Sequence, residues 1–117
     1  MQKVYYLSSC STCKRIMGEL PLDGFEKQDI KTDAITEEQI DQMKSMAGSY
    51  ESLFSRVAMK YRAMGLNNMD LTEEDYRKYI LQEYTFLKRP VFIIDDTIYI
   101  GNSKKNVAAL KAALGVA

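Results

Sequence analysis

The sequence contains no histidine, and only two of its 117 residues are cysteine. A structural zinc site usually takes four Cys or His ligands, and this chain supplies two of them. A zinc site completed by carboxylates or by a second molecule is the alternative, but we expect no metal. Any thiol chemistry must therefore use these two sulfurs, with only lysine, arginine, backbone amides and a helix dipole to assist them.

Excess charge and long hydrophobic runs are also missing. Sixteen basic residues balance sixteen acidic ones, so no global field attracts nucleic acid or an anionic membrane surface. The longest strongly apolar run is residues 91–94, and the first residues lack the apolar stretch of a signal peptide. We therefore expect a cytoplasmic protein, with mostly reduced thiols, that binds no membrane and no nucleic acid directly.

The first third of the chain predicts a strand, a helix and a second strand. Residues 3–7 form a continuous apolar and aromatic run, typical of a strand buried on both faces. Apolar residues follow at helical spacing from Cys13 to Leu20, and Pro21 stops the helix. A second strand is expected over residues 25–30, although its alternation is weak.

The middle third predicts helices with clear start signals. Thr36 and Thr72 each open the pattern of a capping box, in which a threonine and a residue three positions later exchange hydrogen bonds with the backbone. The second of these helices is expected to continue to about Leu87. One or two shorter helices between them should end near Gly65.

The last third predicts a hairpin and a closing helix. Residues 91–94 and 97–100 are β-branched and aromatic, and the two aspartates between them favour a tight turn. Ser103 is a typical N-terminal cap for the final helix, and Gly115 stands at its expected end.

The order of these elements indicates the fold class. It reads β-α-β, a helical insertion over about residues 35–87, then β-β-α. We therefore predict an α/β fold with a thioredoxin-like mixed sheet, as a single domain covering residues 1–117. Pro90 opens the hairpin, and in this topology we expect a cis Arg89–Pro90 bond that lies against the turn containing the cysteines.

The two cysteines lie in Cys-Ser-Thr-Cys at residues 10–13, between the first strand and the first helix. In a short chain without a signal peptide, this spacing is typical of redox chemistry rather than of a structural disulfide. Cys10 precedes the helix, where backbone amides, the dipole, Lys14 and Arg15 favour its thiolate. Cys13 lies on the apolar stripe. We predict that Cys10 is the more acidic and more exposed thiol.

These motifs resemble the ArsC/Spx family along essentially the whole chain. The family includes glutathione- and glutaredoxin-linked arsenate reductases, Spx transcriptional regulators and many relatives of other kinds. The likeness rests on Cys-Ser-Thr-Cys-Lys-Arg after the first strand, the helical insertion, Leu-Phe-Ser-Arg at residues 53–56, Lys-Arg-Pro at residues 88–90 and Ile-Gly at residues 100–101.

The resemblance implies an arsenate reductase-like thiol oxidoreductase. Cys10 would attack a small oxyanion or a disulfide substrate, and Cys13 would resolve the intermediate. Arg89 and Arg56 would bind the oxyanion through their planar guanidinium groups, and Pro90 would be a structural residue of the site. No bound cofactor is implied. Glutathione with glutaredoxin, or thioredoxin, would serve as the external reductant.

Two departures from the arsenate reductase pattern keep an alternative open. Gly101 stands where those enzymes place a third arginine, and Cys13 stands where glutathione-linked members usually have Ser or Thr. Spx-like redox-sensing regulators, which bind RNA polymerase, share both features. Against that alternative, Gly48 lies only near the glycine that those regulators use for polymerase contact, and the residues after it match poorly.

Overall fold

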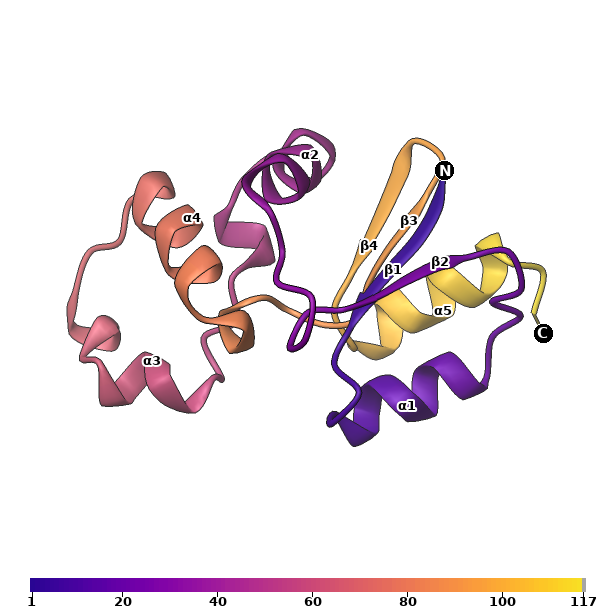
Figure 1. The fold of residues 1–117 in the computed structure, drawn as a ribbon, viewed down its shortest axis with the longest axis horizontal. Coiled ribbons are helices and arrows are strands. Elements are labelled where there is room, and N and C mark those ends of the chain that lie inside the picture. Colours follow the sequence, from indigo (N-terminus) through magenta and orange to yellow (C-terminus); the bar gives the residue numbers. More distant parts are fainter. Residues whose placement is uncertain (117) are drawn as a thin grey trace. The chain divides into compact units, whose positions relative to one another are not determined.

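The computed structural model describes residues 1–116. They form two compact units, one made of Met1–Asp33 with the chain from Arg89 onward, and the other made of Ala34–Lys88. Figure 1 follows the chain from indigo to yellow through both units. Among the described residues, no helix has both the length and the apolar character needed to cross a membrane.

The first unit contains a four-stranded mixed sheet with the strand order β2-β1-β3-β4 (Figure 1). Strand β1 (Gln2–Tyr6) pairs in parallel with β2 (Glu26–Asp29) and antiparallel with β3 (Val91–Ile94). Strand β4 (Thr97–Ile100) completes the hairpin. The predicted mixed α/β sheet is therefore confirmed, with each strand within one or two residues of its expected bounds.

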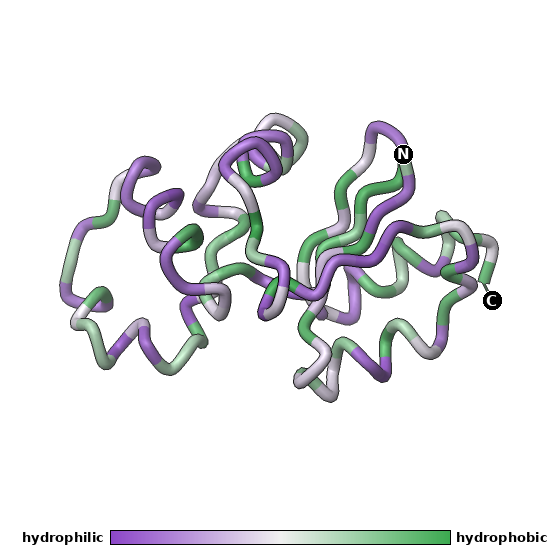
Figure 2. The backbone as a smooth tube through the Cα atoms, viewed as in Figure 1, coloured by the Kyte–Doolittle hydropathy of each residue, from purple (hydrophilic) through white to green (hydrophobic). Residues whose placement is uncertain are grey.

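The edge position of β2 explains its weak sequence signal. Its four residues are Glu-Lys-Gln-Asp, and Figure 2 shows this strand as hydrophilic while β3 is hydrophobic. An edge strand has one unpaired side and needs less apolar surface than a central strand. Within the strand only the polar Gln28 is buried, and the flanking residues Phe25 and Ile30 supply the buried apolar side chains.

Helices α1 (Ser11–Gly18) and α5 (Lys104–Ala113) lie on one face of this sheet (Figure 1). Full burial of one Val, Leu, Ile or Phe side chain stabilises a fold by roughly 1.5–3 kcal/mol. The core between the helices and the sheet therefore anchors α1, and with it the cysteine turn, to β1 and β3. The buried residues of this core are Val4, Ile16, Leu22, Phe25, Phe92 and Leu110.

The second unit is helical, with α2 (Glu37–Ala47), α3 (Met59–Ala63) and α4 (Glu73–Gln82). Both predicted capping boxes are present. The Thr36 hydroxyl accepts the Gln39 N–H at 3.1 Å, and the Gln39 side chain accepts the Thr36 N–H at 3.1 Å. Thr72 and Asp75 repeat this exchange at the start of α4. Single 3₁₀ turns lie at Glu51–Leu53, Leu66–Asn68 and Tyr84–Phe86.

The predicted extension of α4 to about Leu87 is wrong, because the helix ends at Gln82. After an extended Glu83, the 3₁₀ turn at Tyr84–Phe86 leads to an extended Leu87, which forms a bridge with Phe54. The backbone bonds on either side of that bridge are short: the Ser55 N–H donates to the carbonyl of Phe86 at 2.7 Å. A helical backbone could not make this pairing, so tertiary contacts override the local apolar stripe.

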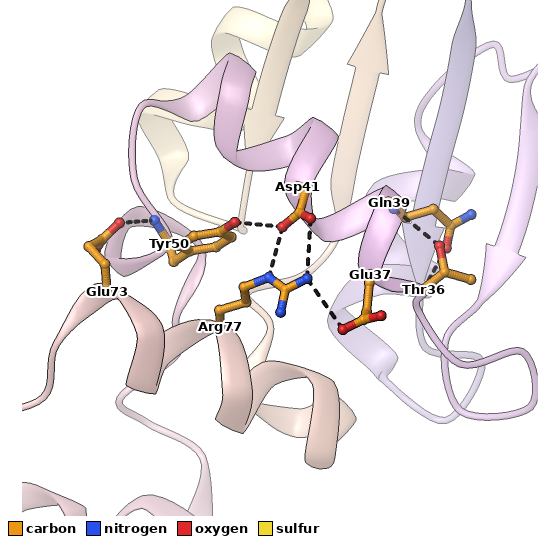
Figure 3. A network of polar contacts seen from close by, with 7 residues as sticks. All are labelled: Thr36, Glu37, Gln39, Asp41, Tyr50, Glu73 and Arg77. Atoms are coloured by element: carbon orange, nitrogen blue, oxygen red, sulfur yellow. Dashed lines mark hydrogen bonds and ion pairs between the residues drawn. The ribbon is translucent and has the colours of Figure 1, made fainter.

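A polar network ties α2 to α4 within the second unit (Figure 3). Arg77 donates to both carboxylate oxygens of Asp41, at 2.9 and 3.2 Å, and the Tyr50 hydroxyl donates to the same carboxylate at 2.5 Å. Glu73 accepts the Tyr50 N–H at 2.7 Å. Hydrogen bonds from the Arg77 guanidinium and from Tyr50 lower the pKa of Asp41 from 3.8 to about 2.

We expect Asp41→Asn to remove an acid-dependent part of the stability of this unit. Because the pKa of Asp41 is lowered on folding, its contribution is complete above pH 3.8 and is lost as the pH falls towards about 2. The free energy of unfolding, measured with urea between pH 5 and pH 2, should therefore fall less steeply with decreasing pH in Asp41→Asn than in the parent. Asp70→Asn, outside the network, is the matched control. Equal slopes in parent and Asp41→Asn would contradict the assignment.

Candidate active site

The turn between β1 and α1 presents Cys10 at the start of the helix. The Cys10 N–H donates to the carbonyl of Leu7 at 3.1 Å, which closes the turn. Cys10 has an extended backbone, with φ −92° and ψ 112°, and its carbonyl accepts the Lys14 N–H at 3.1 Å. The thiol of Cys10 is thus attached to the residue immediately before α1, next to backbone N–H groups that have no partner within the helix.

The two thiols are both reduced, and they differ in burial and acidity. Cys13 has no exposed surface, whereas Cys10 is half-buried. Burial opposes ionisation of Cys10, but hydrogen bonds from the backbone and thiol of Cys13, together with the charge of Arg89, bring its pKa below 9.0. Burial raises the pKa of Cys13 to about 11. The predicted order of exposure and acidity therefore agrees with the structure.

Arg89 and Pro90 lie in the same unit as the cysteines, and the Arg89–Pro90 peptide bond is cis, as predicted. The carbonyl of Pro90 accepts the Gly101 N–H at 2.9 Å, and the next residue, Val91, is paired with Tyr5 of β1. The positive charge of Arg89 acts on both thiols. The structure therefore brings Cys10, Cys13 and Arg89 into one electrostatic neighbourhood.

Arg56 lies in the second unit, where it has two partners of its own. Its Nη2 donates to the Glu51 carboxylate at 2.6 Å and to the Tyr76 hydroxyl at 2.9 Å. The guanidinium also stands over the Tyr76 ring, 5.6 Å from its centre. An oxyanion that binds Arg56 would compete with the Glu51 carboxylate for the same guanidinium group. Sequence reasoning missed both partners, because the contacts depend on the path of the loop and not on helical spacing.

A polar contact that the sequence reasoning also missed holds the loop before Cys10. The hydroxyl and the N–H of Ser8 donate to the carboxylate of Asp29, and these bonds lower the pKa of that carboxyl. Asp29 ends β2, which runs parallel to β1, and Ser8 follows β1. The signal was available in the sequence, since the carboxyl ends of neighbouring parallel strands meet at one edge of a sheet.

Gly101, at the position where the resemblance implies that arsenate reductases carry a third arginine, has a backbone role. It is buried, with a left-handed φ of 86°. Its N–H donates to Pro90, and its carbonyl accepts a bond of 2.8 Å from the Asn106 side chain. A side chain at this φ is strained. An arginine at this position would therefore carry a backbone strain that glycine avoids.

Among residues 1–116, the structure contains no group of three or more Cys, His, Asp or Glu side chains arranged to hold a metal ion.

Comparison with known proteins places this chain in a family. The sequence model of the ArsC family matches residues 5–110. The chain belongs to the ArsC family. This match spans the cysteine turn, the helical insertion and the hairpin. No curated protein matches the chain.

Solved structures of ArsC-related proteins share the fold of this ArsC-family chain. The protein named YFFB is 22% identical, with a TM-score of 0.81 over 97% of this chain and 99% of its own. An arsenate reductase (ArsC) related protein from Brucella melitensis is 21% identical, with a TM-score of 0.67 over 95% and 92%. The arsenate reductase from Vibrio cholerae is 15% identical, with a TM-score of 0.73 over 92% and 95%.

We expect selective alkylation of Cys10 in the reduced protein at mildly acidic pH. The pKa of Cys10 is lowered and its side chain is partly exposed, so it has a larger thiolate fraction than the buried Cys13 thiol, whose pKa is raised to about 11. Brief treatment with iodoacetamide, followed by peptide mass spectrometry, measures the labelled fraction of each cysteine. Faster labelling of Cys13 would reverse the assignment of the reactive thiol.

Proposed function

We propose that this ArsC-family chain is a thiol oxidoreductase with arsenate reductase-like chemistry, in which Cys10 is the nucleophile and Cys13 the resolving thiol. The observation that carries the proposal is the placement of the two thiols, with half-buried Cys10 immediately before α1 and Cys13 completely buried within it; the pKa of Cys10 is lowered and that of Cys13 raised in agreement with this placement. A nucleophile needs thiolate and access, whereas a resolving thiol needs to be inert until an intermediate forms on its neighbour.

In the proposed reaction, the Cys10 thiolate bonds to the arsenic atom of arsenate, and one arsenate hydroxyl takes a proton from solvent and leaves as water. Cys13 then loses its proton to solvent and attacks the sulfur of Cys10. The S–S bond forms, the S–As bond breaks, and its electron pair reduces As(V) to As(III), which leaves as arsenite. The charge of the Cys10 thiolate contributes to the raised pKa of Cys13, so bonding of Cys10 to arsenic removes one barrier to this second step.

Arg89 has two tasks in this proposal. Its charge favours the Cys10 thiolate, and its guanidinium offers planar donors for two oxygens of a tetrahedral oxyanion. We expect Arg89→Gln to shift the pH profile of Cys10 alkylation to higher pH, because the lowering charge is gone. Arg89→Lys should keep most of the pH profile but weaken arsenate binding. An unchanged pH profile in Arg89→Gln would exclude an electrostatic role.

The test of function is an arsenate reduction assay with purified, reduced protein. One reaction contains glutathione and glutaredoxin, and a second contains thioredoxin with its reductase. Sustained arsenite formation in either reaction supports the proposal and identifies the external reductant. Absence of arsenite in both reactions, while the same systems reduce an oxidised Cys10–Cys13 pair, would overturn the oxyanion part of the proposal and leave a general thiol oxidoreductase.

A second candidate is an Spx-like redox-sensing regulator that binds RNA polymerase. It is favoured by Gly101, whose left-handed φ of 86° suits a glycine better than an oxyanion-binding arginine. In that case, formation of the disulfide would change a protein-binding surface, and the protein would not turn over a substrate. Pull-down of purified polymerase by the oxidised and the reduced protein distinguishes the two. Binding that depends on the redox state, without arsenate turnover, would favour the regulator.

A further inference from the structure

A hollow of about 450 Å³ lies beside α1 in the first unit, on the side facing β2. Its volume is within the range of small-molecule sites, which is about 300–1,000 Å³. Its apolar lining includes Tyr6, Met17 and Leu20, which pack on the core with one side and remain partly exposed on the other. The hollow thus leaves apolar surface in contact with water within the folded unit.

The rim of the hollow is charged, with an excess of positive charge. Lys14 projects from α1 and Lys27 from β2, and Asp23 is the single acidic residue. In the part of the chain that the structure describes, neither lysine forms an ion pair, whereas Lys3, Lys60 and Lys111 each do. Two cations beside an apolar floor match a ligand with an anionic head and an apolar body.

Gly18 adds an independent observation at the same place. It is the last residue of α1 and lines the hollow. Its φ is not positive, and a methyl group there would meet no atom within 4 Å. Neither the backbone nor the packing of the free protein therefore requires glycine at this end of the helix. A side chain at residue 18 would enter open space beside the other lining residues of the hollow.

We propose that this hollow binds a small organic carboxylate with an apolar body, its carboxylate held by Lys14 and Lys27 and its body placed on Tyr6, Met17 and Leu20. The site is separate from the thiol chemistry and does not depend on it. It is nevertheless adjacent, because Ser8 and Lys14, which lie on either side of Cys10 in the sequence, both line the hollow. A carboxylate held there adds negative charge near the reactive thiol.

The test is a titration of the ¹⁵N-labelled, reduced protein with 4-phenylbutyrate, followed by amide chemical shifts. The matched probes are 4-phenylbutyramide, which keeps the body and loses the charge, and 4-phenylbutylamine, which reverses the charge. We expect saturable shifts confined to the lining residues with the carboxylate, weaker binding of the amide and the weakest binding of the amine. Equal binding of carboxylate and amide, or shifts spread over both units, would overturn the proposal.

Variants separate the contribution of the two lysine charges to binding from that of the open space at residue 18. Lys14→Gln and Lys27→Gln should each weaken 4-phenylbutyrate binding about two- to fivefold, as expected for exposed ion pairs. Lys105→Gln on α5, outside the hollow, should leave it unchanged. Gly18→Leu should block binding, while Gly18→Ala tests the smallest added group. Binding that survives both Lys→Gln changes and Gly18→Leu in folded protein would show that the hollow is not the site.

Discussion

Replacing Cys10 by serine should reduce arsenate turnover to the level of the protein-free reaction, because no other described side chain offers an activated thiolate. Replacing Cys13 by serine should instead stop the reaction after its first half. Without an external thiol, a Cys13→Ser protein should retain the Cys10–arsenic adduct and release no arsenite, since the resolving attack is missing. Arsenite yield and intact-protein mass spectrometry measure the two outcomes.

The contrast between the two variants is the informative part of this experiment. Both substitutions exchange sulfur for oxygen at nearly the same size, so neither should disturb the first unit. Equal loss of activity in both, without a trapped adduct in Cys13→Ser, would mean that Cys13 does not act on Cys10. Full activity in Cys13→Ser with glutathione present would assign resolution to the external thiol alone.

Replacing Phe54 by alanine should destabilise the second unit by about 3–5 kcal/mol, a large part of the stability of a small domain. Phe54 is completely buried, and its ring contacts those of Tyr61, Tyr76 and Phe86, with centre-to-centre distances of 5.9, 4.9 and 5.1 Å. Removal of this ring leaves a cavity that three fixed aromatic neighbours cannot easily fill. Urea denaturation and amide hydrogen exchange over residues 34–88 measure the loss.

Met59→Ala is the control for that prediction. The Met59 side chain is 90% exposed, so its truncation should change the free energy of unfolding by no more than about 0.5 kcal/mol. A Phe54→Ala protein with parent-like hydrogen exchange in the second unit would contradict the packing described above. Equal losses for Phe54→Ala and Met59→Ala would do the same.

The parts of this fold that the sequence predicted are those decided by local chemistry. These features involve residues that lie close together in the sequence, each within about a turn of its partners. They are the capping boxes at Thr36 and Thr72, the hairpin turn, and the helical stripe that begins at Cys13. The order of the elements along the chain was read from these local patterns, and the cis bond before Pro90 was predicted from the thioredoxin-like topology and from the place of Pro90 at the start of the hairpin. The acidity order of Cys10 and Cys13 came from helix position, which is also local.

The parts that were missed depend on contacts between distant segments. The end of α4 at Gln82 is set by pairing of Leu87 with Phe54, more than thirty positions earlier. The partners of Arg56 include Tyr76, twenty positions away. Such contacts depend on how loops fold back, which periodicity and capping patterns do not encode.

A single-turnover experiment tests the central claim most directly, namely that Cys10 and Cys13 together transfer two electrons to an oxyanion. Fully reduced protein is mixed with excess arsenate, without any external reductant, and the reaction is stopped with acid. We predict one arsenite and one Cys10–Cys13 disulfide for each protein molecule, in equal amounts at every time point. Disulfide formation by a general oxidant together with no arsenite from arsenate would contradict the account.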